Sequence, residues 1–268
     1  MAETLRMQSG ERIVLEATTP AGRDATSAIY VHGLGSHRGG EKALFLEREL
    51  TARGLGFVRF DLRGHGESDG RLQDLTLTRQ LEDLAAVVDH VGSGAAGPRP
   101  RRLLLIGASL GALTVAWHTA LARPQPRSNP VLLGQVLIAP AFRIIERYLA
   151  ALGDFGRARW QREGTYRFVG PWFEFDLGWN VVTDADRHPH SRLLRETTLP
   201  TLLLHGTKDE TAPLELSVEF AAECVGVRPR LVAVEGGDHR LTAFKERLLA
   251  EIVRFVAENS EGELACAS

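Results

Sequence analysis

Residues 101–112, with the sequence RRLLLIGASLGA, constrain the fold of this chain more than any other stretch. A run of branched apolar residues ends at Gly107, a Gly-x-Ser-x-Gly motif centred on Ser109 follows, and helix-forming residues come next. This order predicts a buried strand, a sharp turn and a helix. Gly107 and Gly111, two residues to either side of Ser109, let neighbouring backbone pass close to a strained turn.

The position of Ser109 also suits chemistry. A side chain at the tip of such a turn projects above the sheet, at the start of a helix whose free N–H groups favour a developing negative charge. A strand-to-helix turn can equally carry a serine with no such role. The motif alone therefore leaves both interpretations open, and the rest of the chain has to decide between them.

Length and composition point to a single α/β enzyme-sized domain. A chain of 268 residues with 44% hydrophobic and 25% charged residues can bury one large core. The net charge of −2 gives no basic surface for nucleic acid. Only two cysteines, Cys224 and Cys266, are present, which indicates a reducing compartment and no disulfide framework.

The first twelve residues, MAETLRMQSGER, lack the apolar region of a signal peptide. No uncharged apolar run approaches the roughly 18 residues that a membrane-spanning helix needs. We therefore expect a cytoplasmic protein with no membrane span, acting on a small molecule. The sequence makes no prediction of oligomeric state.

The chain alternates strands with helices, which predicts a mostly parallel, doubly wound sheet of about eight strands with helices on both faces. The first two strands, around Ser9 and Gly10, read as a hairpin at the sheet edge. Strands are expected at residues 5–8, 12–17, 27–31, 56–60, 103–106, 131–138, 201–204 and 231–234, and helices at residues 41–53, 78–91, 110–121, 213–224 and 242–256. In such a sheet, functional residues collect at the carboxyl ends of the strands.

Residues 141–195 interrupt this alternation after the sixth strand and are too long for a simple crossover. We interpret them as a lid inserted into a catalytic domain formed by residues 1–140 and 196–268. Short helices are expected at residues 143–152 and 155–162, followed by a hairpin that turns near Gly170 and Pro171.

The lid is rich in aromatic residues: ten of the chain's 18 lie between Phe142 and Trp179. Some of them must form the lid's own core, and we expect about half to face a substrate. The candidates for substrate binding are Trp160, Tyr166, Phe168, Trp172 and Phe173.

A serine nucleophile needs a base, and the base needs an orienting acid. Asp209 follows the strand at 201–204 and His239 follows the strand at 231–234, so both are expected at the same sheet edge as Ser109. Asp209 would accept a hydrogen bond from His239 Nδ1 while Nε2 takes the Ser109 proton. Glu210 and Asp238 are rival carboxylates, ranked lower because Glu210 is one position late and Asp238 is adjacent to the base.

The predicted oxyanion hole consists of two backbone N–H groups. One belongs to Leu110, the residue after the nucleophile, and the other to Leu34 in the loop after the strand at 27–31. Gly35 is the alternative if that loop is shifted by one residue. His32 is interpreted as a hydrogen-bonding partner that shapes the loop.

The remaining histidines give no pattern of metal ligands. In His188-Pro189-His190 a third ligand is missing and the proline favours the start of a helix. His65 in RGHGES is interpreted as a structural group of its loop, and His37, His90, His118 and His205 have no ligand spacing. We predict no metal and no cofactor.

Five motifs occur in an order that resembles the α/β-hydrolase superfamily: HGLG, FDLRGHGESDG, GASLGA, LLLHGTKDETAP and GGDH. The stretches YVHGLGSHRGGEKA and EGTYRFVGPWFEF and the ending GGDHRL are similar to the branch of mitochondrial palmitoyl-protein thioesterases and acyl-glucuronide esterases. The resemblance implies an α/β-hydrolase fold and esterase or thioesterase activity. It further implies a triad of Ser109, Asp209 and His239 that works without a cofactor.

The favoured function is a serine hydrolase that cleaves carboxylic esters or thioesters with an apolar acyl group through an acyl-enzyme. A serine aminopeptidase or a lipid-ester (monoacylglycerol-like) hydrolase is the alternative. An aminopeptidase would need lid carboxylates to hold the substrate ammonium, and the lid offers Glu163, Glu174, Asp176, Asp184 and Asp186. A non-catalytic binding protein on the same scaffold is the least favoured interpretation, because no triad member is missing.

Overall fold

The computed structural model describes residues 2–20, 26–122, 130–170 and 173–266. Eight strands form one sheet, as the sequence predicts. They are β1 (Glu3–Arg6), β2 (Arg12–Thr18), β3 (Thr26–Val31), β4 (Gly56–Phe60), β5 (Arg102–Ala108), β6 (Val131–Ile138), β9 (Thr201–Gly206) and β10 (Arg230–Val234). Every residue of β5 is buried, which is what a strand covered on both faces requires.

The strands lie in the order β1-β2-β4-β3-β5-β6-β9-β10. The edge hairpin is confirmed, since β1 pairs antiparallel with β2, and β2 pairs antiparallel with β4. All other neighbours are parallel. The carboxyl ends of β3, β5, β6, β9 and β10 consequently meet along one edge, where the predicted functional residues follow them.

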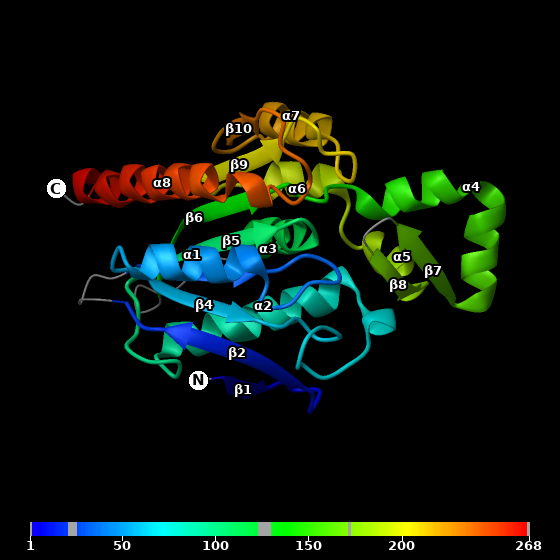
Figure 1. The fold of residues 1–268 in the computed structure, drawn as a ribbon, viewed down its shortest axis with the longest axis horizontal. Coiled ribbons are helices and arrows are strands. Elements are labelled where there is room, and N and C mark those ends of the chain that lie inside the picture. The colour runs from blue at the N-terminus through cyan, green and yellow to red at the C-terminus, as the bar shows by residue number, and fades with distance from the viewer. Residues whose placement is uncertain (1, 21–25, 123–129, 171–172, 267–268) are drawn as a thin grey trace.

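Helices cover both faces of the sheet, and each face has its own core (Figure 1). Side chains of α2, α3, α6 and α7 pack in one core, and those of α1 and α8 in the other. The bounds are α1 (Glu41–Thr51), α2 (Leu77–Ser93), α3 (Leu110–Leu121), α6 (His190–Glu196), α7 (Leu214–Glu223) and α8 (Lys245–Cys266), with single 3₁₀ turns η1 (Leu72–Asp74) and η2 (Thr242–Phe244).

Between β6 and β9 lies the segment predicted as a lid, which projects beyond one end of the sheet in Figure 1. It contains α4 (Ile144–Glu163), the antiparallel pair β7 (Thr165–Gly170) and β8 (Phe173–Gly178), and α5 (Asn180–Ala185). The two predicted helices are confirmed, because Gly153, at φ 61°, breaks α4 into two helical pieces. The hairpin is confirmed as well, although its turn at 171–172 lies outside the described residues.

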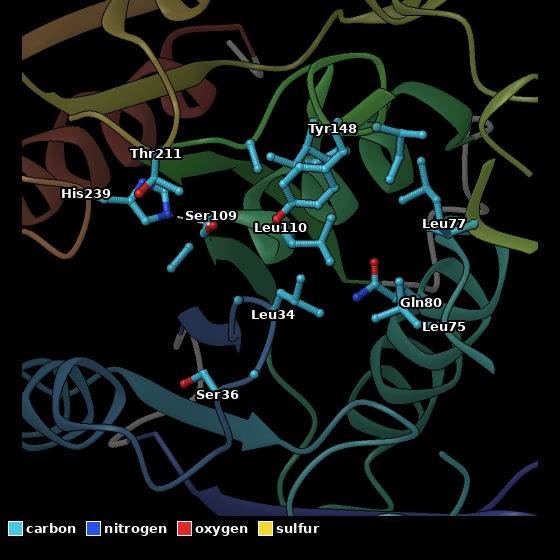
Figure 2. Close-up of a pocket in the computed structure, with 18 of the residues that line it drawn as sticks. Leu34, Ser36, Leu75, Leu77, Gln80, Ser109, Leu110, Tyr148, Thr211 and His239 are labelled. Atoms are coloured by element: carbon cyan, nitrogen blue, oxygen red, sulfur yellow. Dashed lines mark hydrogen bonds between the residues drawn. The ribbon is translucent and has the colours of Figure 1, made fainter. Parts of the chain in front are cut away.

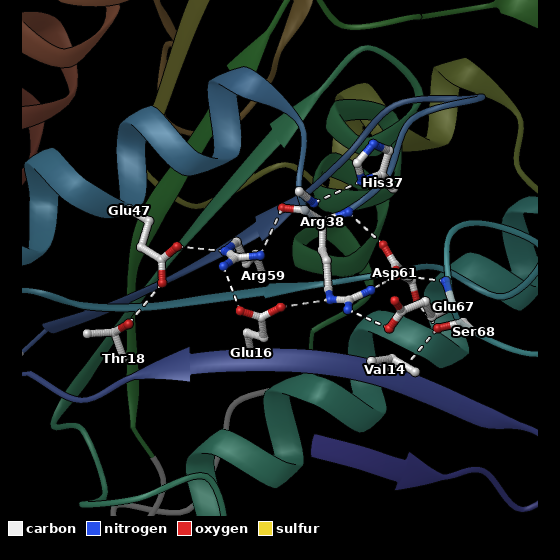
Figure 3. Close-up of polar contacts among 11 residues, drawn as sticks. Val14, Glu16, Thr18, His37, Arg38, Glu47, Arg59, Asp61, Glu67 and Ser68 are labelled. Atoms are coloured by element: carbon white, nitrogen blue, oxygen red, sulfur yellow. Dashed lines mark hydrogen bonds and ion pairs between the residues drawn. The ribbon is translucent and has the colours of Figure 1, made fainter. Parts of the chain in front are cut away.

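A network of ion pairs joins the loops that follow β3 and β4 to the strands beneath them (Figure 3). Its centre is Arg38, which pairs with Glu16, Asp61 and Glu67. Arg59 on β4 continues the network to Glu16 and to Glu47 on α1. Asp61 is fully buried, and it also accepts hydrogen bonds from the backbone amides of Arg38 at 2.6 Å and Glu67 at 3.0 Å. The network fixes the loop after β3, which carries Leu34.

Candidate active site

Ser109 occupies the sharp turn between β5 and α3, as predicted. Its backbone has φ 54° and ψ −118°, a conformation that L-residues rarely adopt. A Cβ added to Gly107 would overlap the carbonyl oxygen of Gly111 and the Cα of Ala112. A Cβ on Gly111 would overlap the carbonyl oxygens of Val31 and His32. Both glycines are therefore required by close backbone approach, which explains the motif in physical terms.

The structure brings Ser109, His239 and Asp209 together from three strand ends. His239 Nε2 lies 2.9 Å from Ser109 Oγ, and His239 Nδ1 lies 2.7 Å from Asp209 Oδ2. Because Asp209 Oδ2 accepts the hydrogen bond from His239 Nδ1, the Nδ1 atom carries the proton and Nε2 is free to accept the serine proton. This is the geometry in which an imidazole can activate a hydroxyl nucleophile.

Asp209 is held as a carboxylate. Its side chain is fully buried, and its Oδ1 atom accepts from the amides of Thr211 at 2.9 Å and Ala212 at 2.8 Å. Burial alone would raise the pKa of Asp209, but hydrogen bonds from His205, His239 and the backbone outweigh it and hold the pKa well below its usual range. A stable negative charge here favours the imidazolium that forms on His239 when it takes a proton.

The two rival carboxylates, Asp238 and Glu210, do not take the position of Asp209 beside His239. Asp238 Oδ1 accepts from the amide of Leu241 at 2.8 Å, and so stabilises the turn that leads into η2. Glu210 is exposed. Neither makes a hydrogen bond to His239 among the contacts of the described residues, whereas Asp209 does.

His205, which sequence reasoning set aside, is a neighbour of this constellation. The ring is completely buried, and its Nε2 lies 3.1 Å from Asp209 Oδ2 and 2.7 Å from the carbonyl oxygen of Ala212. Both of these atoms are acceptors, so Nε2 carries the proton and Nδ1 accepts from Ser217 Oγ at 2.7 Å. His205 thus donates to the same carboxylate oxygen as His239. The sequence did contain a signal that could have identified His205: it lies four residues before Asp209, at the end of a strand.

The predicted oxyanion hole lies beside the serine. Leu110 is the first residue of α3, so its N–H has no acceptor within the helix. A Cβ on Gly33 would stand 3.0 Å from Ser109 Cβ, which places the following amide, that of Leu34, next to the nucleophile. Both leucines line the same cavity as Ser109 (Figure 2).

His32 shapes this loop, as expected from the sequence. Its Nε2 atom accepts from the amide of Leu62 at 3.1 Å, and its Nδ1 atom donates to the carbonyl oxygen of Gly33 at 2.8 Å. Complete burial lowers the pKa of His32 to about 3, so the ring is neutral. It connects the loops after β3 and β4.

Ser109 and His239 open into a cavity of about 2040 Å³ between the sheet edge and the lid. Its apolar wall carries side chains from α3, from the start of α2 and the loop before it, and from the lid: Leu75, Leu77, Leu113, Trp117, Ile144, Tyr148, Leu149, Phe175, Leu177, Trp179, Val181 and Val182. The lining also contains charged side chains, among them Lys208, which precedes Asp209, and Arg240, which follows His239. A cavity of this kind accommodates an apolar group next to the nucleophile.

The lid aromatics predicted to bind substrate need correction. Trp160 is completely buried, donates from Nε1 to the carbonyl oxygen of Leu177 at 3.0 Å, and packs against Tyr166 and Phe168. These three rings form the core of the lid and do not belong to the cavity wall. Trp172 lies outside the described residues, as does the side chain of Phe173.

Five other aromatic residues line the cavity: Tyr30, Trp117, Tyr148, Phe175 and Trp179. Phe175 pairs with Phe168 across the β7–β8 hairpin. The two rings therefore lie on the same face of the hairpin, although Phe175 reaches the cavity and Phe168 does not.

The lid carboxylates considered for an aminopeptidase are mostly engaged elsewhere. Glu163 pairs with Arg159, Glu174 and Asp176 with Arg167, and Asp184 accepts from Thr78 on α2. Asp186 is the member of this set that lines the cavity. Within the described part of the chain, no three His, Cys, Asp or Glu side chains are grouped to hold a metal ion. Nor does any helix there have the length and apolar character to span a membrane.

The chain belongs to the alpha/beta hydrolase family, whose model matches residues 28–253. Its fold and its relatives make it an esterase- or thioesterase-type hydrolase.

Among its relatives is the mitochondrial palmitoyl-protein thioesterase ABHD10 of Mus musculus, 29% identical over 218 residues, which are 80% of this chain and 68% of the relative. The Bos taurus counterpart is matched over 66% of its length, so this chain spans about two thirds of these relatives. A bifunctional esterase/perhydrolase of Acinetobacter calcoaceticus is 24% identical over 87% of this chain and 92% of its own. The solved structure of mouse alpha/beta hydrolase domain-containing protein 10 superposes with a TM-score of 0.80 at 24% identity, covering 96% of this chain and 99% of the other.

Proposed function

We propose that this protein is a serine hydrolase that cleaves carboxylic esters or thioesters with an apolar acyl group. The observation that carries the proposal is the continuous hydrogen-bond path from Ser109 through His239 to Asp209, opening into a cavity with an apolar wall. The names of the relatives, thioesterase and esterase, support the same class of substrate.

In the proposed reaction, Ser109 Oγ attacks the substrate carbonyl carbon as His239 Nε2 takes the hydroxyl proton. The carbonyl oxygen becomes an oxyanion that accepts from the amides of Leu34 and Leu110. His239 then gives its proton to the departing alkoxide or thiolate, and an acyl-Ser109 ester is left. A water molecule attacks this ester with His239 again as base, and it releases the carboxylic acid and restores the hydroxyl of Ser109.

The test is the substitution Ser109→Ala, assayed with a panel of p-nitrophenyl esters and acyl thioesters. We expect kcat/KM to fall by about 10⁴-fold or more, because the attacking group is removed. Ser93→Ala is the matched control, since Ser93 is exposed at the end of α2 and its hydroxyl contacts only the local backbone. Turnover by Ser109→Ala equal to that of Ser93→Ala would refute the mechanism.

A fluorophosphonate probe gives an independent measurement. It should label the parent and Ser93→Ala but not Ser109→Ala. An unlabelled parent with no turnover of any ester, thioester or amide would favour a non-catalytic binding protein. Faster turnover of amino-acid β-naphthylamides than of esters would favour an aminopeptidase.

A further inference from the structure

One wall of the cavity contains a buried amide with an unused hydrogen-bonding atom. Gln80, on α2, is only 2% exposed and yet lines the cavity. Its Oε1 atom accepts from Thr114 Oγ1 at 3.1 Å, while none of the described residues accepts from its Nε2 atom. Figure 2 shows the amide close to Leu75, with its nitrogen directed into the cavity.

The other orientation of this amide leads to the same result. Thr114 has one hydroxyl proton but two acceptors in reach, Gln80 Oε1 and the carbonyl oxygen of Leu110, each at 3.1 Å. If that proton goes to Leu110, the amide of Gln80 turns over, donates to Thr114 and presents its oxygen to the cavity. Either way one buried polar atom of Gln80 has no partner among the described residues.

The reaction geometry decides which part of a substrate meets Gln80. His239 has to protonate the leaving group, so the leaving group lies on the His239 side of Ser109. The acyl group must then extend to the opposite side. In Figure 2, His239 lies on one side of Ser109, and Leu75, Leu77 and Gln80 lie on the other. The amide is therefore set into the apolar wall that the acyl group contacts.

We propose that Gln80 binds a hydroxyl group on the acyl part of the substrate, so that hydroxylated acyl esters are the preferred substrates; this inference rests on the function proposed above. A purely hydrocarbon acyl group would cover the amide and leave its polar atom unpaired, which is unfavourable because the covered atom loses access to water. A hydroxyl can both donate and accept, so it pairs with either orientation of the amide. The surrounding leucines and Trp117 would contact the rest of the acyl chain.

The first experiment uses the parent protein alone. It is assayed with p-nitrophenyl esters of ω-hydroxy acids over a series of chain lengths, each paired with the ester in which a methyl group replaces the hydroxyl. For at least one length, kcat/KM should be at least about tenfold higher for the hydroxylated ester, because only that ester satisfies the buried amide. Equal or lower values at every length would overturn the proposal.

The second experiment locates the preference at Gln80. In Gln80→Met, which keeps the volume and removes the amide, the ratio of kcat/KM for the hydroxylated ester over its methyl partner should fall by at least about tenfold. The matched control is Gln161→Met, because Gln161 lines the same cavity but is exposed to water. There the ratio should stay at the parental value. If this ratio of kcat/KM values is unchanged in Gln80→Met, the preference arises from other residues and the proposal is overturned.

The outcomes separate this inference from the proposed function. If esters are hydrolysed in a Ser109-dependent way but without preference for hydroxylated chains, the inference fails and the serine hydrolase stands. If no ester is hydrolysed and no fluorophosphonate label is taken up, the serine hydrolase itself fails. Labelling of Gln80→Met at the parental rate shows that this variant is folded with an intact nucleophile.

Discussion

Removing the guanidinium of Arg38 should destabilise the protein far more than an ordinary loss of an arginine. The substitution is Arg38→Met, which keeps much of the aliphatic volume. Asp61, its partner, is fully buried, and breaking a buried pair on one side typically costs about 3–5 kcal/mol because the remaining charge is stranded. Two backbone amides still donate to Asp61, so we expect the lower end, about 3 kcal/mol.

The remaining partners of Arg38 change the expected loss of unfolding free energy little. Glu67 is 69% exposed and Glu16 is 28% exposed, and pairs with such carboxylates contribute at most about 1 kcal/mol. For a domain of this size a loss of 1 kcal/mol lowers the melting temperature by about 2 °C. Arg38→Met should therefore melt about 6 °C below the parent.

Thermal unfolding followed by circular dichroism measures this shift. Arg12→Met is the matched control, because Arg12 also pairs with an aspartate, Asp69 at 2.7 Å, but is 53% exposed. Its melting temperature should stay close to that of the parent. Equal melting temperatures for the two variants would refute the argument that burial gives the Arg38 pair its importance. Below its melting temperature, Arg38→Met should also have a lower kcat, because the loop with Leu34 is less firmly held.

Three further predictions concern the site and the effect of pH. Asp209→Asn should lower kcat by about 10⁴-fold, because an amide does not hold His239 in the required tautomer. The control Glu210→Gln should leave kcat near the parental value. The reverse result would identify Glu210 as the acid. His205→Phe should lower kcat by about tenfold with little change in KM, because Asp209 loses one of its two histidine donors; steady-state kinetics on the folded variant check this, and an unchanged kcat would contradict it. Burial acts to raise the pKa of Glu11, but hydrogen bonds from Arg79 and Arg63 hold it at about 2, below the ordinary 4.5. Since the pKa is lower in the folded state, the native ion pairs stabilise the fold fully above pH 4.5, and this contribution is lost as the pH falls towards 2. Denaturant unfolding between pH 4.5 and 2 should show that the free energy of unfolding falls less in Glu11→Gln than in the parent. An equal fall in both proteins would contradict the assignment.

The grouping of Ser109, His239 and Asp209 could be predicted because each of these residues is tied to a backbone constraint. Ser109 is marked by two glycines that close packing demands. Asp209 and His239 follow strands whose carboxyl ends must meet in a parallel sheet, so chain order alone brought them to the edge where Ser109 lies. The number of strands followed from the same alternation of elements.

The lid's aromatic residues could not be assigned, because their environment depends on how α4 and the hairpin pack against the sheet. Trp160 and Tyr148 lie on the two helical pieces of α4, and the first is buried in the lid while the second lines the cavity. Gln80 was missed for a similar reason, since it reads as one polar position of an amphipathic helix. His205 was missed because β9 continues to Gly206, two residues beyond the predicted end of the strand, and so carries this ring into the core beside Asp209.

The contact between the turn at Ser109 and the loop after β3 leaves no free space on either side. Gly33 abuts the β-carbon of Ser109, and Gly111 abuts the carbonyl oxygens at the end of β3. The hydroxyl of Ser109 and the amides beside it are therefore carried by one stiff block of backbone, and neither can shift without the other. Substrates of different size must be accommodated by the opposite wall, which α4, broken at Gly153, helps to form.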